Sequence, residues 1–204
     1  MSRLRYTTAR LLFETFPELG SKSATAPTDD PPVIFLQRLA GQEKFEDAVA
    51  FCAHLLPRRE AVWWGCGSVR SFLGDTLQGQ FAGLVAAETW VHEPSDENRL
   101  LALRIGTQSD HSDPLAWLAR AAGWSGGMLS SVPNPPVPVP PYLTARAVRI
   151  AILLSARQIR SPERAERMLA CIAEGLKLAE PDEDNRRGPA EPDWNDRNRR
   201  FESA

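Results

Sequence analysis

Residues 163–179, ERAERMLACIAEGLKLA, decide the fold class of this chain. Apolar and small side chains recur there at three- and four-residue steps, in Ala165, Met168, Leu169, Ile172, Leu176 and Ala179. This spacing follows the period of an α-helix, and it leaves the charged side chains on the opposite face. Pro162 stands just before the stretch, where proline favours the first turn of a helix. The stretch therefore predicts an amphipathic helix that packs against a core.

The same spacing extends back through most of the chain. Helical apolar steps occur in residues 33–40, 42–56, 58–73, 76–92, 95–105, 113–123 and 141–160. Prolines and capping residues such as Asp113-Pro114 separate these stretches. No stretch shows the two-residue alternation of a half-buried strand. The sequence predicts an all-α fold, either an antiparallel helical bundle or an irregular array of helical hairpins, with seven to eight helices.

The two ends of the chain differ in composition from this helical region. A short helix is expected within residues 1–19, and the small, polar residues 20–32 are expected to form a linker. Residues 33–179 are expected to form the helical domain, with a proline-rich strap at 124–142. Residues 180–204 are mainly charged and contain only two large apolar groups, so we expect a disordered tail.

Residues 58–73, which contain adjacent tryptophans, and residues 76–92 are expected to form the buried centre of the fold. Trp63 and Trp64 point about 100° apart on a helix, so covering both requires protein on two sides. Glycines lower helix propensity, and those in this region are expected to permit close approach between helices. They are Gly65, Gly67, Gly79 and Gly83.

Charge and cysteine content narrow the class of protein. The formal net charge is −2, which is unlike a protein that mainly coats nucleic acid or anionic lipid. Three scattered cysteines in apolar surroundings indicate reduced thiols, and together with the absence of a recognisable export signal they favour the cytoplasm. No run of about 18 apolar residues occurs, so we expect no membrane insertion.

The sequence contains no legible catalytic, cofactor or metal site. Cys52, His54 and Cys66 lack the paired short spacings of zinc ligands. Asp110, His111 and Ser112 are too close in sequence to form a catalytic triad. An enzyme whose polar groups converge only in three dimensions stays open as an alternative, and its candidate groups are His54, His92, His111, Glu60 and Glu88.

The least generic stretch is WSGGMLSSVPNPPVPVPPY, residues 124–142. Its six prolines enforce an extended path with few backbone donors, which places it at the surface. It could simply strap the last two helices to the body. A rigid apolar segment also loses little entropy when a partner docks on it. We therefore treat the strap, defined as residues 124–142, as a candidate docking surface.

A second candidate surface follows the strap. Six arginines and two glutamates give residues 146–167 a local charge of +4, which suits an acidic partner, RNA or the chain's own tail, although a solvated helix face is the simplest reading. Nucleic acid is the less favoured partner and another protein the preferred one. The expected partner-binding residues are Trp124, Met128, Leu129, Pro138, Tyr142, Arg146, Arg149, Arg157 and Arg160.

Three motifs carry a resemblance to a known family. Residues 56–64 (LPRREAVWW), 124–127 (WSGG) and 139–148 (VPPYLTARAV) resemble a family of small proteobacterial proteins of unknown function, over about residues 33–178. Members of that family are similar to accessory proteins found beside the spike and effector components of type VI secretion systems. The resemblance implies a non-enzymatic adaptor or chaperone-like role, with a spike component or effector as partner, and it assigns no catalytic residue.

Overall fold

The computed structural model describes residues 6–21, 25–74, 81–129, 137–160 and 163–179. Within these ranges the chain is all-α, with one isolated β-bridge and no strand. The helices are α1 (Ala9–Thr15), α2 (Pro17–Gly20), α3 (Pro32–Gly41), α4 (Phe45–Leu55), α5 (Arg58–Leu73), α6 (Ala82–His92), α7 (Asp96–Gln108), α8 (Pro114–Gly123), α9 (Tyr142–Ala156) and α10 (Glu163–Ala179). These ten described helices exceed the seven to eight that we expected, because the N-terminal segment contributes two and α2 is a single turn started by Pro17.

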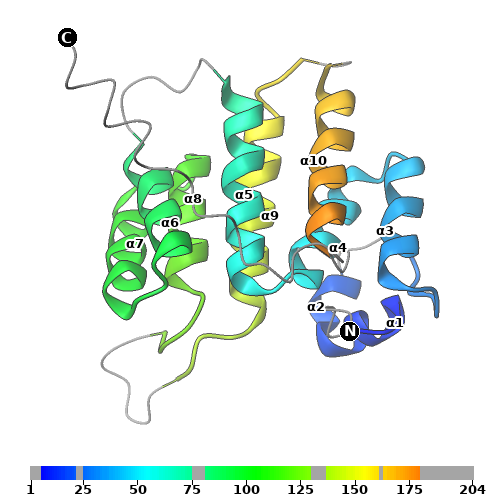
Figure 1. Ribbon diagram of the computed structural model, residues 1–204, viewed down its shortest axis with the longest axis horizontal. Coiled ribbons are helices and arrows are strands. Elements are labelled where there is room, and N and C mark those ends of the chain that lie inside the picture. Colours follow the sequence, from blue (N-terminus) through cyan, green and yellow to red (C-terminus); the bar gives the residue numbers. More distant parts are fainter. Residues whose placement is uncertain (1–5, 22–24, 75–80, 130–136, 161–162, 180–204) are drawn as a thin grey trace, which may run out of the picture.

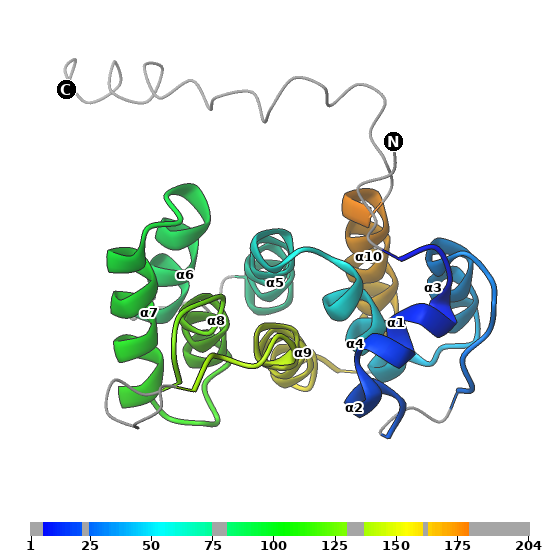
Figure 2. The same ribbon diagram turned by 90° about the horizontal axis from the view of Figure 1, so that it is seen from below.

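The helices form two groups, one on each side of a central pair. Helices α5 and α9 lie side by side in the middle, α6, α7 and α8 lie on one side, and α10 with α1 to α4 lies on the other (Figures 1 and 2). Both central helices run upward in Figure 1, whereas α10 runs back down. The central pair is parallel because three helices intervene between α5 and α9. The architecture is therefore an irregular helical array rather than a simple antiparallel bundle.

Helix α5 is central, as its tryptophans predicted, but the two rings have different environments. Trp64 is 3% exposed, and its indole Nε1 donates a hydrogen bond to the Cys171 carbonyl of α10 at 2.8 Å. Trp63 is 46% exposed, and its ring makes an edge contact with the ring of His92, with centroids 5.8 Å apart. The expectation that both rings are covered was wrong for Trp63, which is nearly half exposed and lies beside the last residue of α6.

Glycine allows close contact at two of the four positions that we singled out. A Cβ atom at Gly83 would collide with the Leu115 carbonyl of α8, and one at Gly65 would lie 3.0 Å from Leu118 and 3.1 Å from Val148. No atom lies within 4 Å of a Cβ built at Gly67, so that expectation was wrong there. Gly79 lies outside the described residues.

The N-terminal helix packs into the core. Phe13 contacts both Phe35 and Phe51, with ring centroids 5.8 Å apart in each pair. The backbone N–H of Ala9 donates to Asp30, and the N–H of Arg10 donates to Thr28, both at 2.9 Å. The described part of the segment that we expect as a linker thus fastens α1 to the body. The expected tail at 180–204 lies outside the described residues.

Two caps confirm helix starts that the sequence suggested. The Ser95 hydroxyl accepts a hydrogen bond from the Asn98 N–H, which begins α7. The Asp113 carboxylate accepts one from the Leu115 N–H, which begins α8 with Pro114 in its first turn. Helix α8 follows α7 and leads directly into the strap.

Candidate functional site

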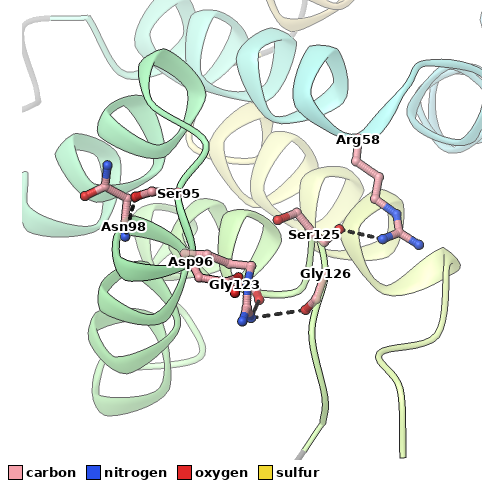
Figure 3. A network of polar contacts seen from close by, with 8 residues as sticks. Arg58, Ser95, Asp96, Asn98, Gly123, Ser125 and Gly126 are labelled. Carbon is pink, nitrogen blue, oxygen red and sulfur yellow. Dashed lines mark hydrogen bonds and ion pairs between the residues drawn. The ribbon is translucent and has the colours of Figure 1, made fainter.

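The first turn of the strap is held by a buried arginine of α7. Arg99 is 8% exposed, and its Nη1 donates to the carbonyls of Gly123, at 3.2 Å, and Gly126, at 3.1 Å. Its Nε donates to Asp96 at 2.8 Å. Figure 3 shows Gly123 and Gly126 close to the start of α7. The guanidinium thereby supplies a donor to the Gly123 carbonyl, which has no intrahelical partner because it ends α8, and to the Gly126 carbonyl in the turn that follows.

Two more donors hold the same turn from other helices. Arg58, at the start of α5, donates from Nη1 to the Ser125 carbonyl at 2.5 Å (Figure 3). The Thr144 hydroxyl of α9 donates to the Trp124 carbonyl at 3.0 Å. Gly127 completes the turn with φ +75°, where a Cβ would lie 2.5 Å from Nη2 of Arg99. Side chains from α5, α7 and α9 therefore converge on a turn that needs glycine.

Beyond this turn the two legs of the strap pair with each other. The Leu129 N–H donates to the Val137 carbonyl at 2.8 Å, and the Val139 N–H donates to the Gly127 carbonyl at 3.0 Å. Met128 and Pro138 form an antiparallel bridge. The residues between the legs, 130–136, lie outside the described residues. The described part of the strap is thus the base of a hairpin whose two legs are fastened to each other, and the expected extended path of the prolines between the legs lies outside the described residues.

Three apolar side chains stand out from this base. Met128 is 49% exposed, Leu129 is 44% exposed and Val137 is 45% exposed, and we call these three residues the strap patch. Val139, two residues after Val137, turns inward and is buried. Pro138 is exposed beside the patch, whereas Trp124 is half-buried against Trp117, with ring centroids 6.4 Å apart. Trp124, one of the expected contact residues, thus mainly packs the turn against α8.

The four arginines that we expected to bind a partner are divided between two places. Arg146 and Arg149 line a cavity near the start of α9 together with Tyr142. Arg157 caps the other end of α9, and both Arg157 and Arg160 are exposed there. Arg157 is eleven positions after Arg146, which corresponds to about 16 Å along the helix axis. The two ends of this arginine row therefore cannot contact one small partner group.

Two further arginines of the basic region serve the fold. Arg164 donates from Nε and Nη2 to the Ile159 carbonyl, at 3.0 and 2.7 Å. Arg167 donates to the Ser71 carbonyl near the end of α5, at 2.7 Å, and pairs with Glu163 at 2.6 Å. Their guanidinium groups are therefore partly occupied at helix ends, which weakens the case for a continuous nucleic-acid surface over 146–167.

The candidate groups for catalysis lie in separate environments. His54 packs on Phe16, His92 on Trp63 and His111 on Trp117. Glu88 forms a two-point ion pair with Arg70, at 2.6 and 2.7 Å.

The cysteines show no activated thiol. All three are buried, and burial raises the pKa of each, to about 12 for Cys171. The thiolate is the nucleophile and the metal ligand, so these thiols are poor candidates for either role. Within the described ranges, no three His, Cys, Asp or Glu side chains are grouped so that they could hold a metal ion.

Sequence reasoning missed the residues that fasten the strap. Arg58 and Arg99 lie 67 and 27 positions from the carbonyls they reach, and nothing in sequence spacing indicates such a contact. The only available signal was the Gly126-Gly127 pair, which predicts a tight turn but does not predict its partners.

Comparison with known proteins gives a family but no activity. Residues 35–179 match the model of a protein family that is described only as a family of unknown function. No curated protein and no solved structure matches the chain. No helix in the described part of the chain has the length and apolar character needed to cross a membrane.

Proposed function

Because the chain belongs to the family of unknown function DUF6931, we propose its function from its geometry: it is a non-enzymatic protein-interaction module that docks a partner on the strap patch. The observation that carries this proposal is the contrast between the patch and its base. Three apolar side chains are about half exposed, yet three helices supply donors to the turn that presents them.

Such a surface favours binding for a simple reason. Burying exposed apolar area against a partner contributes about 25 cal/mol per Å², and ordering a loop during binding offsets much of that gain. Here the hairpin base is ordered before a partner arrives, because Arg58, Arg99 and Thr144 already hold it. Binding then does not have to order the hairpin base, so the free energy gained by burying the strap patch contributes directly to affinity.

The partner class follows from the sequence resemblance. The LPRREAVWW, WSGG and VPPYLTARAV motifs resemble proteobacterial proteins found beside type VI secretion components. We therefore propose a cytoplasmic adaptor or chaperone-like factor whose partner is a spike component or an effector of that system. No cofactor is assigned to this role.

A pairwise pull-down with purified candidate spike and effector proteins tests this proposal. We expect Met128→Ser/Leu129→Ser to reduce capture at least about tenfold, since apolar anchors at the centre of an interface commonly contribute about 1 kcal/mol or more each. Leu100→Ser/Leu101→Ser is the matched control, because these leucines are similarly exposed on α7. If the strap variant binds the same partner as tightly as the control does, the strap is not the docking surface.

A further inference from the structure

One edge of the hairpin base carries a backbone donor and a backbone acceptor that are not paired. The two hydrogen bonds between the legs of the strap flank the bridged residues Met128 and Pro138. In an antiparallel ladder this pattern makes the bridged residues a non-hydrogen-bonded pair, whose own backbone groups point away from the opposite leg. The N–H and the carbonyl of Met128 therefore point outward, and neither has a hydrogen-bond partner among the described residues.

The other edge of the hairpin base is closed by prolines. Pro138 and Pro140 flank Val139 on the second leg. The N–H of Val139 is bonded to the first leg, so the backbone nitrogens of its two neighbours face the opposite way. Proline has no N–H, and this edge therefore offers no donor to an added strand. An extended segment can pair in full only with the first leg, residues 127–129, which are all exposed.

The strap patch spans both faces of this hairpin base. Side chains alternate between the two faces along an extended leg, so Met128 lies on the face opposite Leu129. Val137 lies across from Leu129 and shares its face with the buried Val139. A partner with a flat surface would cover only one of these faces. A segment that adds at the edge of the first leg carries side chains on both faces, so it contacts Met128 on one and Leu129 on the other.

We infer that the strap binds its partner by strand addition: an extended segment with apolar side chains pairs with residues 127–129, accepts a hydrogen bond from the Met128 N–H and donates one to the Met128 carbonyl. This inference rests on the proposed docking function and specifies the kind of partner that the strap recognises. In this mode the main-chain hydrogen bonds provide affinity, and the side chains beside Met128 and Leu129 provide specificity.

The same backbone groups disfavour a helical partner. A helix pairs its backbone groups internally, so it has none to offer to Met128. Covering the strap patch with a helix would remove water from the Met128 N–H and carbonyl without replacing the lost hydrogen bonds, which opposes binding. An extended segment supplies both partners while it covers the patch.

A short strand-forming peptide tests the inference on the full chain. The probe is acetyl-KTVIVTK-amide, and the matched control is the same peptide with its three central residues N-methylated, which keeps every side chain but removes the central donors. In the free ¹⁵N-labelled protein, we expect the Met128 amide to exchange faster than those of Leu129 and Val139. Saturating probe should slow Met128 exchange about tenfold or more, and N-methylation should weaken binding about tenfold.

Three results with the peptides would overturn the inference. They are no binding at millimolar probe, equal binding of the two peptides, and binding that leaves Met128 exchange unchanged. Protection of Met128 that rises with the concentration of the chain alone would also overturn it, because a second copy of the chain would then be the occupant of the edge.

Two substitutions separate the backbone of Met128 from its side chain. Met128→Ala shortens the side chain and keeps the N–H, whereas Met128→Pro also removes the N–H. We expect the proline variant to bind the probe about tenfold more weakly than the alanine variant. Unchanged exchange at Val139 verifies that the hairpin base is intact in both. Pro138→Ala is the control on the other leg and should not weaken binding. Equal weakening by both Met128 variants would show that no backbone bond forms there.

The docking proposal and the strand-addition inference fail in different ways. If the candidate spike and effector proteins do not bind but the probe protects Met128, the partner assignment is wrong and strand addition stands. If a partner captured through the strap patch leaves Met128 exchange unchanged, the docking proposal stands and strand addition is wrong.

Discussion

Replacing Arg99 with methionine should loosen the base of the strap and destabilise the whole fold. Methionine keeps most of the apolar stem of the side chain but removes the guanidinium. The carbonyls of Gly123 and Gly126 then lose donors at 3.2 and 3.1 Å. A hydrogen bond to a charged group contributes about 1.5–3 kcal/mol, and the half-buried Gly126 carbonyl can regain water. We therefore take the lower bound for both bonds and expect a loss of about 3 kcal/mol.

Thermal unfolding followed by circular dichroism measures this loss. For a chain of this size about 1 kcal/mol shifts the midpoint by about 2–4 °C, so the expected decrease is about 6–12 °C. Asp96→Asn is the control, because it removes only the ion pair between Arg99 and a carboxylate that is 85% exposed, which contributes at most about 1 kcal/mol. Amide hydrogen exchange should also accelerate at Leu129 and Val139 in Arg99→Met. A decrease no larger than that of Asp96→Asn would show that the buried guanidinium does not hold the turn.

Three further predictions concern the core. Gly83→Ala should lower the unfolding midpoint by several degrees, because its Cβ collides with the Leu115 backbone of α8, whereas Gly67→Ala should leave it equal or higher. The thiols should not react with a disulfide reagent at pH 8 until denaturant unfolds the chain, since burial raises the pKa of Cys52, Cys66 and Cys171; rapid reaction in the native state would contradict this. The pKa of His54 is lower in the folded chain than its ordinary value, so the folded state binds fewer protons. Its stabilising contribution is complete above about pH 6.5 and is lost as the pH falls, and His54→Gln should flatten that part of the stability profile.

Helix type and position could be predicted from sequence, because a 3.6-residue apolar period is a local property. Helix α10 shows both the success and its limit. Met168 and Ile172 of the predicted stripe are buried, but Leu169 is 44% exposed. The buried face also includes Gly175, where a Cβ would collide with Cys52 and lie 3.0 Å from Trp64. The apolar period predicts where the helix lies. Which residues at the edges of its apolar face become buried depends on the helix that packs against it.

For the candidate site, too, sequence could predict the local features of the strap but not its contacts with distant residues. Its prolines and glycines predicted a surface segment, and the exposed side chains of Met128, Leu129 and Pro138 agree with that prediction. Val137 was missed, because a single valine between prolines has no distinguishing pattern. The clamp by Arg58 and Arg99 was missed because it depends on contacts between distant parts of the chain.

The basic region at 146–167 shows why charge counting alone misassigns surfaces. A helix ends with four carbonyls that have no intrahelical partner, and an arginine nearby can donate to them. Arg167 does this at the end of α5, and Arg164 donates to the Ile159 carbonyl in the connection that follows α9. Arg149 instead lies beside Glu46, with 3.9 Å between Nη2 and the carboxylate, and lines a cavity together with Glu18 and Asp47. The formal charge of +4 is unchanged by these contacts, but each restricts the guanidinium to one local task. A phosphate backbone needs a row of freely orientable cations, and of the six arginines only the pair Arg157 and Arg160 lies together at one exposed end of α9 without such a contact in the described residues. The argument for a protein partner therefore depends on the apolar strap patch and not on the arginines that first drew attention to this helix.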